Sequence, residues 1–465
     1  MSLVIDQEIR HLVSADMANH YRVLPGLVND HGLTLYIDEA NNSEDVKDEI
    51  EMLIGHRVSF IPTDTAEIQK ALSRYYRQER DLVSIKSFSL SENDFLEMLI
   101  LEARSLKSSD IHFEIYETEA RIRFRIDGQL IERFRVEHDN YLELVNKIKI
   151  KSKLNITEKR LPQDGRITTG EFDIRVSILP TLFGEKIVMR LLGQDASNIS
   201  LNILGFKEEE HYHYLEAVRK PNGIILISGP TGSGKTTTLY ATLKLLNDDK
   251  RNILTVEDPI EYTLKGINQV QLKEDIGLTF SAALKSFLRQ DPDIIMLGEI
   301  RDPETALMAI RASLTGHLVL STIHTNSALG TISRLIDMGV PSYLIAETLN
   351  LSVAQRLLRK LCNHCKVRVP FIATDFPRSF KIPYTLDNLY KPSGCNNCFH
   401  TGYKGRMAIY ELFSIGYETA IMIKNNETQK LAAAIKYKTL SAQAYDLLAS
   451  GETSLEEIYS ILINI

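Results

Sequence analysis

Short apolar runs alternate with amphipathic segments between residues 205 and 355, and this alternation is the clearest pattern in the chain. The short runs are typical of strands buried on both faces, and the segments between them carry apolar residues at helical spacing. Strands of this kind belong to parallel sheets that are covered by helices. The predicted strands occupy residues 223–228, 252–256, 293–297 and 317–321.

Residues 1–88 show shorter and more mixed patterns. Val46, Ile50 and Leu53 share one face of a helix at 3.6 residues per turn. A short β-branched and aromatic run follows, which favours a strand. We therefore expect a small α+β domain here, without recognisable chemistry. Its predicted elements are a helix over residues 45–55 and a strand over 58–61.

Residues 89–195 carry two hairpin signals. Residues 121–126 alternate strictly between arginine and apolar side chains, and Asp127 with Gly128 supplies a type I′ turn before a further extended segment. A second turn near Gly170 precedes a strand over 172–178. Between the hairpins lies a basic patch, for which a solvated helix face is the plainer interpretation. The patch consists of Lys147, Lys149, Lys151, Lys153, Lys159 and Arg160.

Length and composition narrow the class of protein. At ~150 residues per domain, the 465 residues predict about three domains rather than one. A content of 44% hydrophobic and 25% charged residues excludes wholesale disorder, and a net charge of -7 argues against a dedicated nucleic-acid binder. No apolar run reaches the ~18 residues of a membrane span, and the start lacks the pattern of a signal peptide. We expect a cytoplasmic protein.

The decisive motif is a complete G-x-x-x-x-G-K-[ST] sequence after the first predicted strand. Its glycines let backbone N–H groups surround a phosphate, the lysine adds a cation, and the hydroxyl of Thr236 can bind Mg²⁺. A chance match is the alternative, but a strand precedes the loop and a helical pattern follows it. The expected nucleotide contacts are Gly229, Pro230, Thr231, Gly232, Ser233, Gly234, Lys235, Thr236 and Thr237.

Polar residues end three of the other predicted strands. Glu257 and Glu299 each follow an apolar strand, where carboxylates can serve a metal and a water molecule. Taken alone, either glutamate is as well explained as a surface acid, and it is their pairing downstream of the P-loop that favours catalysis. His324 ends a third strand. A structural histidine and a contact to the γ-phosphate or the attacking water are both open interpretations.

The four cysteines form two C-x-x-C pairs, Cys362 with Cys365 and Cys395 with Cys398. Two such pairs can close a tetrahedral Zn²⁺ site. A redox function is the competitor, but two redox pairs would be redundant and neither opens a thioredoxin-like unit. His364 and His400 lie nearby, and we interpret both as non-ligands because four sulfurs fill the shell.

The chain resembles the secretion ATPase superfamily, and within it the assembly ATPases of type II secretion and type IV pili. The similarity covers nearly the whole chain and rests on specific motifs. Besides the P-loop and the cysteines, these motifs are Ser109–His112, Arg160–Arg166, Thr255–Pro259, Arg289–Asp293, Gly298–Asp302, Gly316–His317, His324–Asn326 and Gly402–Arg406.

The resemblance implies an α/β fold with a RecA-like P-loop ATPase core built on a parallel sheet. Two α+β N-terminal domains precede the core, the second being PAS-like and bearing arginine fingers. A tetracysteine zinc module and a helical C-terminal domain follow it. The expected domains are residues 1–88, 89–195, 196–355, 356–410 and 411–465.

The resemblance also implies roles for single residues. Glu299 is the expected catalytic glutamate, with Glu257 acting near Mg²⁺ and the γ-phosphate, and Lys235 and His324 as further members of the site. Two arginines of the second N-terminal domain match the family motifs, Arg175 and Arg190. The implied cofactors are ATP, Mg²⁺ and Zn²⁺. The implied assembly is a homohexamer that meets adaptor and platform proteins at the cytoplasmic face of the inner membrane.

Departures from the family pattern are few. Ile115 stands where many relatives have proline, and Ile323 precedes His324 where leucine is commoner. The N-terminal region, by which relatives dock to the membrane partner, is short. Retraction ATPases of the family generally lack both that region and the cysteines, which favours assembly. A nucleic-acid translocase would need a basic channel or aromatic surface, and the chain has no Trp. A scaffold that only binds nucleotide is the remaining alternative.

A basic stretch surrounds the first cysteine pair. Contact with anionic lipid and neutralisation of Zn-bound thiolates are both compatible with it, and we favour neutralisation. The stretch comprises Arg356, Arg359, Lys360, Lys366 and Arg368.

Overall fold

The computed structural model describes residues 9, 12–13, 15–29, 32–54, 57–65, 67–68, 71–72, 95–169, 172–192, 200–427, 430–431 and 437–463. The chain divides into two compact units. The first consists of Met1–Asn93 together with the short segment Arg133–Glu137, and the second of Asp94–Glu132 and His138–Ile465.

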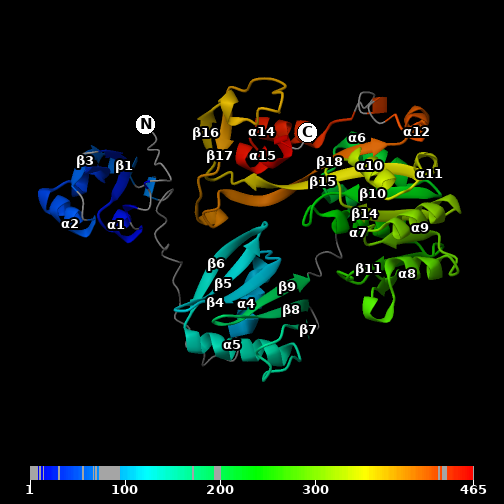
Figure 1. Ribbon diagram of the computed structural model, residues 1–465, viewed down its shortest axis with the longest axis horizontal. Helices are drawn as coiled ribbons and strands as arrows, with labels where there is room; N and C mark the ends of the chain where they lie inside the picture. The colour runs from blue at the N-terminus through cyan, green and yellow to red at the C-terminus, as the bar shows by residue number, and fades with distance from the viewer. Residues whose placement is uncertain are drawn as a thin grey trace. The chain divides into compact units, whose positions relative to one another are not determined.

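The first unit is a small α+β structure (Figure 1). In its sheet β1 pairs with β2 in antiparallel orientation and β2 pairs with β3 in parallel. Leu35, Ile37 and Ile50 are fully buried in its core. The predicted helix and strand are confirmed as α2 and β3. Leu53 is 59% exposed instead of sharing the buried face. The elements are α1 (Ala15–His20), β1 (Val23–Asn29), β2 (Gly32–Asp38), η2 (Glu39–Asn41), α2 (Glu44–Ile54) and β3 (Val58–Thr63).

A six-stranded sheet follows, in the order β6-β5-β4-β9-β8-β7. The predicted hairpin around Asp127 and Gly128 is confirmed, since both residues have positive φ, 49° and 83°, as a type I′ turn requires. The predicted turn at Gly170 lies outside the described residues. The elements are α4 (Phe95–Ser105), β4 (Asp110–Ile115), β5 (Ala120–Ile126), β6 (Gln129–Val136), α5 (His138–Lys151), β7 (Gln163–Thr169), β8 (Phe172–Thr181) and β9 (Gly184–Leu192).

One member of the predicted basic patch is not on a solvated face. Lys149 is fully buried in α5, and its Nζ lies 2.7 Å from Glu185 Oε1 and donates to the Glu158 carbonyl at 2.7 Å. For Lys149 the interpretation of a solvated helix face is therefore wrong. The ion pair supplies the counter-charge that a buried ammonium needs.

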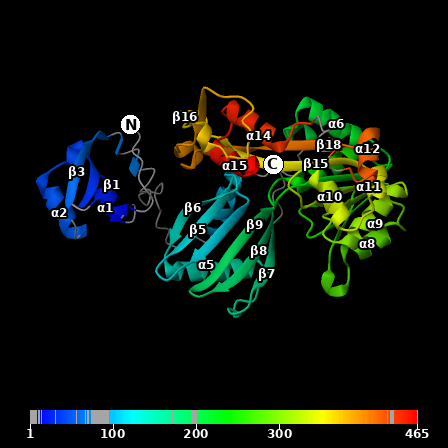
Figure 2. The ribbon, with the colours of Figure 1, turned by 45° about the horizontal axis from the view of Figure 1, so that its top comes forward.

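The predicted parallel sheet is present (Figures 1 and 2). It has seven strands in the order β12-β11-β13-β14-β10-β15-β18. Neighbouring strands are parallel except for β18, which runs antiparallel to β15. The four predicted strands are confirmed as β10, β11, β13 and β14. The strands are β10 (Gly223–Ser228), β11 (Ile253–Glu257), β12 (Asn268–Gln271), β13 (Ile294–Leu297), β14 (Leu318–Ile323), β15 (Leu349–Leu361) and β18 (Tyr403–Ser414).

Both faces of this sheet are buried, as its continuous apolar strands require. In β10, Ile224 and Leu226 belong to one core cluster while Ile225 and Ile227 belong to another, because successive side chains point to opposite faces. On the face of Ile224 and Leu226 the covering helices are α8 (Phe280–Phe287), α9 (Pro303–Leu314), α10 (Gly330–Asp337) and α11 (Ser342–Thr348). On the face of Ile225 and Ile227 they are α6 (Glu208–Val218) and α7 (Lys235–Leu246).

The cysteine-bearing segment is an insertion between the long strands β15 and β18. Residues 356 and 411, where we expected domains to begin, lie inside these two strands, which pair along most of their length. Helices α14 and α15 of the C-terminal region pack against β15. The remaining elements are η4 (Leu201–Ile203), η5 (Glu274–Ile276), β16 (Val367–Pro370), η6 (Ala373–Asp375), β17 (Asn388–Lys391), η7 (Asn396–Cys398), α12 (Tyr417–Lys424), α14 (Leu440–Ala449) and α15 (Leu455–Ile463).

Among the described residues, we find no helix that combines the length and the apolar character needed to cross a membrane.

Candidate functional site

The carboxyl ends of β10, β13 and β14 meet at one edge of the seven-stranded sheet. Ser228, the last residue of β10, is paired with Ile323, the last residue of β14, and Leu297 of β13 is paired with Ser321. The segments that follow these strands therefore emerge side by side. They carry the P-loop, Glu299 and His324, so the parallel topology brings the predicted motifs together.

The P-loop has the backbone that its glycines predict. Gly229, Gly232 and Gly234 have φ values of 149°, 80° and 89°, which L side chains rarely adopt. The φ of Gly234 strongly favours glycine, and a Cβ there would lie 2.8 Å from Gln355 Nε2, so the Gln355 side chain would also have to move. Helix α7 begins directly after the loop, at Lys235. Its N-terminal N–H groups and dipole favour a phosphate group at this place.

The polar side chains of the loop fit a nucleotide and its metal ion. The buried Ser233 hydroxyl has no hydrogen-bond partner among the described residues. Thr236 is exposed at the start of α7, where its hydroxyl can bind Mg²⁺. Lys235 Nζ donates to the carbonyls of Gly229 and Pro230, at 2.8 and 3.1 Å. Burial lowers the pKa of Lys235, whereas the negative charge of Glu299 raises it.

Glu299 is the carboxylate that faces the P-loop lysine. Its Oε2 lies 3.2 Å from His324 Nε2, and its Oε1 forms an ion pair with Arg301. The side chain of Glu299 is 14% exposed and that of His324 is 54% exposed, so the pair borders solvent. This arrangement holds a carboxylate between two side chains that can donate to it, beside the expected position of the phosphates. It can orient and polarise a water molecule.

Glu257 lies in a different environment. It is 3% exposed, and its carboxylate accepts hydrogen bonds from Tyr240, Thr255 and Gln269, at 2.6 Å from the Thr255 hydroxyl and 3.1 Å from the Gln269 amide. Burial and the charge of Glu257 raise the pKa of Tyr240. Glu257 is thus buried at the end of β11 with three neutral hydrogen-bond donors, while Glu299 is more exposed and lies at the carboxyl edge of the sheet.

The six-stranded sheet presents a row of arginines. Arg175 and Arg190 are directly opposite each other on β8 and β9, and Arg166 and Asp110 are the next cross-strand partners on either side. Arg175 donates to the carbonyl of Ile260 and lies 3.8 Å from Glu261, in the segment after β11. Arg190 Nε lies 3.1 Å from Asp110 Oδ1. Arg175 therefore contacts the segment that follows β11, while Arg190 is paired within its own sheet.

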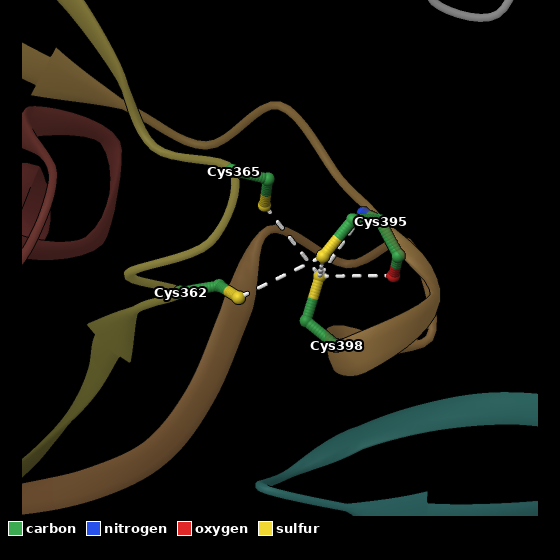
Figure 3. Close-up of side chains that lie close together, drawn as sticks. All are labelled: Cys362, Cys365, Cys395 and Cys398. Atoms are coloured by element: carbon green, nitrogen blue, oxygen red, sulfur yellow. Dashed lines mark hydrogen bonds between the residues drawn. The ribbon is translucent and has the colours of Figure 1, made fainter.

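The sulfur atoms of the four cysteines converge between two loops (Figure 3). The Cys362–Cys395, Cys365–Cys398 and Cys395–Cys398 sulfur distances are 3.9, 3.7 and 3.8 Å. Four thiolates at about 2.3 Å around a tetrahedral Zn²⁺ would be about 3.8 Å apart. Backbone N–H groups of Gly394 and Gly402 donate to Cys365 and Cys398 at 3.3 Å, which suits thiolate charge. The donor set fits Zn²⁺.

Two residues of the basic stretch near the cysteines contact groups other than the thiolates. Arg359 forms an ion pair with Glu457 and lies over the ring of Tyr403. Lys366 Nζ donates to the Gly451 carbonyl at 2.9 Å. Arg359 and Lys366 thus have a carboxylate and a carbonyl of the C-terminal region as their partners, and neutralisation of the thiolates by the basic stretch stays a prediction.

Sequence reasoning missed two cations near the P-loop. Arg301 pairs with Glu299, and Arg356 lies beside Gly229, where a Cβ would come within 3.2 Å of its Nη1. The signal for Arg301 was its position two residues after Glu299. The signal for Arg356 was weaker, since only the parallel pairing of β10 with β15 brings it to the loop.

Comparison with known proteins identifies the family. The model of the family described as "Type II/IV secretion system protein" matches residues 86–460, and that of the MshEN domain matches residues 1–82. The type IV pilus assembly ATPase PilB of Myxococcus xanthus is 39% identical to this chain, over 98% of this chain and 86% of its own length. The type II secretion system protein E of Dickeya dadantii is 45% identical over 78% of this chain and 74% of its own length.

Solved structures agree with this relationship. The pilus retraction motor PilT, solved with bound ADP, is 27% identical and superimposes with a TM-score of 0.56, covering 79% of this chain and 97% of PilT. The ATPase DotB of Legionella pneumophila shares the fold, with 21% identity and a TM-score of 0.60 over 83% of this chain and all of DotB. The chain belongs to the type II/IV secretion system protein family.

Proposed function

We propose that this protein is an ATP-hydrolysing motor that works as a homohexameric ring and drives assembly of a type IV pilus or a type II secretion pseudopilus. It acts at the cytoplasmic face of the inner membrane, through adaptor and platform proteins. The observation that carries the proposal is the meeting of Lys235, Glu299 and His324 at one sheet edge. The identity to assembly ATPases over nearly the whole chain supports the biological role.

In the mechanism that we infer, the P-loop N–H groups and Lys235 bind and orient the phosphates. The Thr236 hydroxyl would hold Mg²⁺, and the bound ion would neutralise charge on the phosphate chain. Glu299 accepts a hydrogen bond from the attacking water, which orients it, and takes up its proton as the water attacks. His324 fixes the Glu299 carboxylate by its contact at 3.2 Å. Glu257 keeps the end of β11 in place through its three donors.

Arginines of the six-stranded sheet complete the site in this proposal. Charge supplied by an arginine to the transferring phosphoryl group is worth roughly 10³–10⁵ in rate. Arg175 reaches the segment after β11, and Arg190 stands directly beside it on the next strand. A small closing movement of the sheet against the ATPase core would therefore gate hydrolysis.

The cysteine cluster is the proposed Zn²⁺ site, and we propose that this site is structural rather than catalytic. All four positions of a tetrahedral shell are taken by Cys362, Cys365, Cys395 and Cys398, so no position is left for a substrate. Ion binding would stabilise the insertion between β15 and β18.

Assembly is favoured over retraction by two features of this chain. PilT, a retraction motor, is matched over 97% of its own length by only 79% of this chain, so this chain has parts that PilT lacks. PilB of Myxococcus xanthus, an assembly ATPase, matches 98% of this chain. A nucleotide-binding scaffold remains the alternative function, and it predicts binding without turnover.

The proposal is tested by measuring ATP turnover and mass in solution together, with and without Mg·ATP. Hydrolysis that rises with a hexamer-sized species, and that is lost in Lys235→Ala, supports the ring motor. Binding without turnover, in the presence of the cognate platform protein, would support the scaffold instead. Complementation of a deletion strain then separates the machines: restored surface pili or restored secretion indicates which one the motor serves.

A further inference from the structure

Arg356 is a half-buried cation beside the P-loop, on a strand to which no role in nucleotide binding has been given. It lies two residues beyond Ala354, which is paired with Ser228 at the end of β10. Strand β15 continues past that point because β18 supports it by antiparallel pairing. The extension carries Arg356 to the first turn of the P-loop, where a Cβ on Gly229 would lie 3.2 Å from Arg356 Nη1.

The guanidinium of Arg356 contacts only neutral acceptors in the part of the chain that the structure describes. Nη1 donates to the Gln355 carbonyl at 3.0 Å, and Nη2 donates to the Asn326 carbonyl at 3.0 Å and to Asn326 Oδ1 at 3.5 Å. Arg359, three residues along the same strand, instead has the carboxylate of Glu457. Among the described residues Arg356 therefore forms no ion pair, although the charge of Glu411 acts on it from a distance, whereas Arg359 does form one.

Two further observations place an anion-binding function here. Burial lowers the pKa of Arg356, and the positive charge of Arg356 contributes to lowering the pKa of Lys235 after the larger effect of burial. A desolvated cation next to a second cation costs free energy in the folded protein. Such a cost is offset when an anion binds against both groups, and a polyphosphate is the anion that a P-loop takes.

We propose that Arg356 is a second cationic ligand of the nucleotide's phosphate chain, acting with Lys235 at the first turn of the P-loop. The proposal rests on the proposed ATPase function and names a residue that the function does not by itself require. Through its two hydrogen bonds to Asn326, Arg356 also ties the segment after His324 to the start of the P-loop.

The test compares Arg356→Gln and Arg356→Lys with the wild type, using calorimetric titration with Mg·ADP and with a slowly hydrolysed Mg·ATP analogue. Loss of a hydrogen-bonded charge should weaken binding of the analogue about 10- to 100-fold in Arg356→Gln. Arg356→Lys keeps the charge and should recover part of the affinity. Lys360→Gln is the matched control, since Lys360 lies on the same strand with its Nζ 3.8 Å from Glu452, away from the P-loop.

A second readout separates a ligand from a structural residue. Removing an unpaired, half-buried charge should leave the thermal midpoint of the nucleotide-free protein unchanged or raise it. The proposal would be overturned if Arg356→Gln bound each nucleotide as tightly as the wild type does. It would also be overturned if Arg356→Gln had a lowered thermal midpoint and Arg356→Lys recovered none of the lost nucleotide affinity. If the wild type itself bound neither nucleotide, the proposed ATPase function would fail instead, so the two failures are distinguishable.

Discussion

Arg175 and Arg190 stand directly opposite each other on β8 and β9, so two like charges share one cross-strand pair. Asp110, the partner of Arg190 on its other side, lies 3.1 Å from Arg190 Nε and 3.3 Å from Arg125 Nε. One carboxylate thus serves two arginines. Like charges in this position destabilise a sheet. Their presence is understandable if the row faces an anion for part of the working cycle.

Replacement of Arg190 should therefore separate stability from activity. Arg190→Gln removes the repulsion with Arg175, so we expect an unchanged or slightly higher thermal midpoint. We expect ATP turnover to fall by about 10³-fold, because the arginine contributes charge in the transition state. Turnover assays and thermal unfolding of the same preparations check this. The control is Lys147→Gln, which changes a partly exposed lysine paired with Glu143. Normal turnover in Arg190→Gln would contradict the role.

The cysteine cluster predicts one zinc ion per chain. Cys395→Ser with Cys398→Ser removes two of the four ligands, so zinc measured by mass spectrometry of the purified protein should fall to background. We also expect easier proteolysis between β15 and β18, because bound metal stabilises this insertion. His364→Ala should keep its zinc. Equal zinc in the double variant and the wild type would show that the cysteines do not hold the metal.

Glu114 predicts a pH dependence of stability. Burial by itself would raise its pKa, but hydrogen bonds from Arg123 and Arg121 lower it from 4.5 to about 2. A carboxylate with a lowered pKa stabilises the fold above the unfolded-state pKa, and this contribution is lost as the pH falls from 4.5 towards 2. A shift of this size corresponds to about 3 kcal/mol at most, which solvent screening reduces to about 1–2 kcal/mol.

The measurement is the thermal midpoint as a function of pH. Wild type should lose stability more steeply between pH 4.5 and 2 than Glu114→Gln, which should be less stable than wild type at pH 7. Glu117→Gln, an exposed acid in the following turn, should behave as wild type. Parallel pH curves for Glu114→Gln and wild type would show that the carboxylate is not coupled to its arginines.

The sequence predicts the central sheet well because its signals are local. Apolar runs mark β10, β11, β13 and β14 within one residue at each start, and the P-loop is recognisable by its glycines. Edge strands are harder. The exposed strand β12 (Asn268–Gln271) carries no apolar pattern, and β18 joins the sheet only after the cysteine insertion.

Contacts between distant segments account for the rest. The local sequence around Lys149 favours a surface position, because its buried partner Glu185 is far away in the sequence. In the same way, the Glu457 carboxylate pairs with Arg359, which lies far from it in the sequence. The charges themselves were visible in the sequence. Their partners depend on tertiary packing, which no local pattern encodes.

The proposed catalytic role of Glu299 is tested most directly by the ATP turnover and nucleotide affinity of Glu299→Gln. The control is Glu347→Gln, which changes an exposed acid of α11. Glutamine keeps the size of the side chain and a carbonyl oxygen for His324 but cannot accept a proton, so turnover should fall by about 10²–10⁴-fold. Affinity for Mg·ATP should stay within a few-fold of wild type, because Lys235 and the P-loop are unchanged. Turnover that survives in Glu299→Gln would contradict the central claim and move the catalytic role to Glu257.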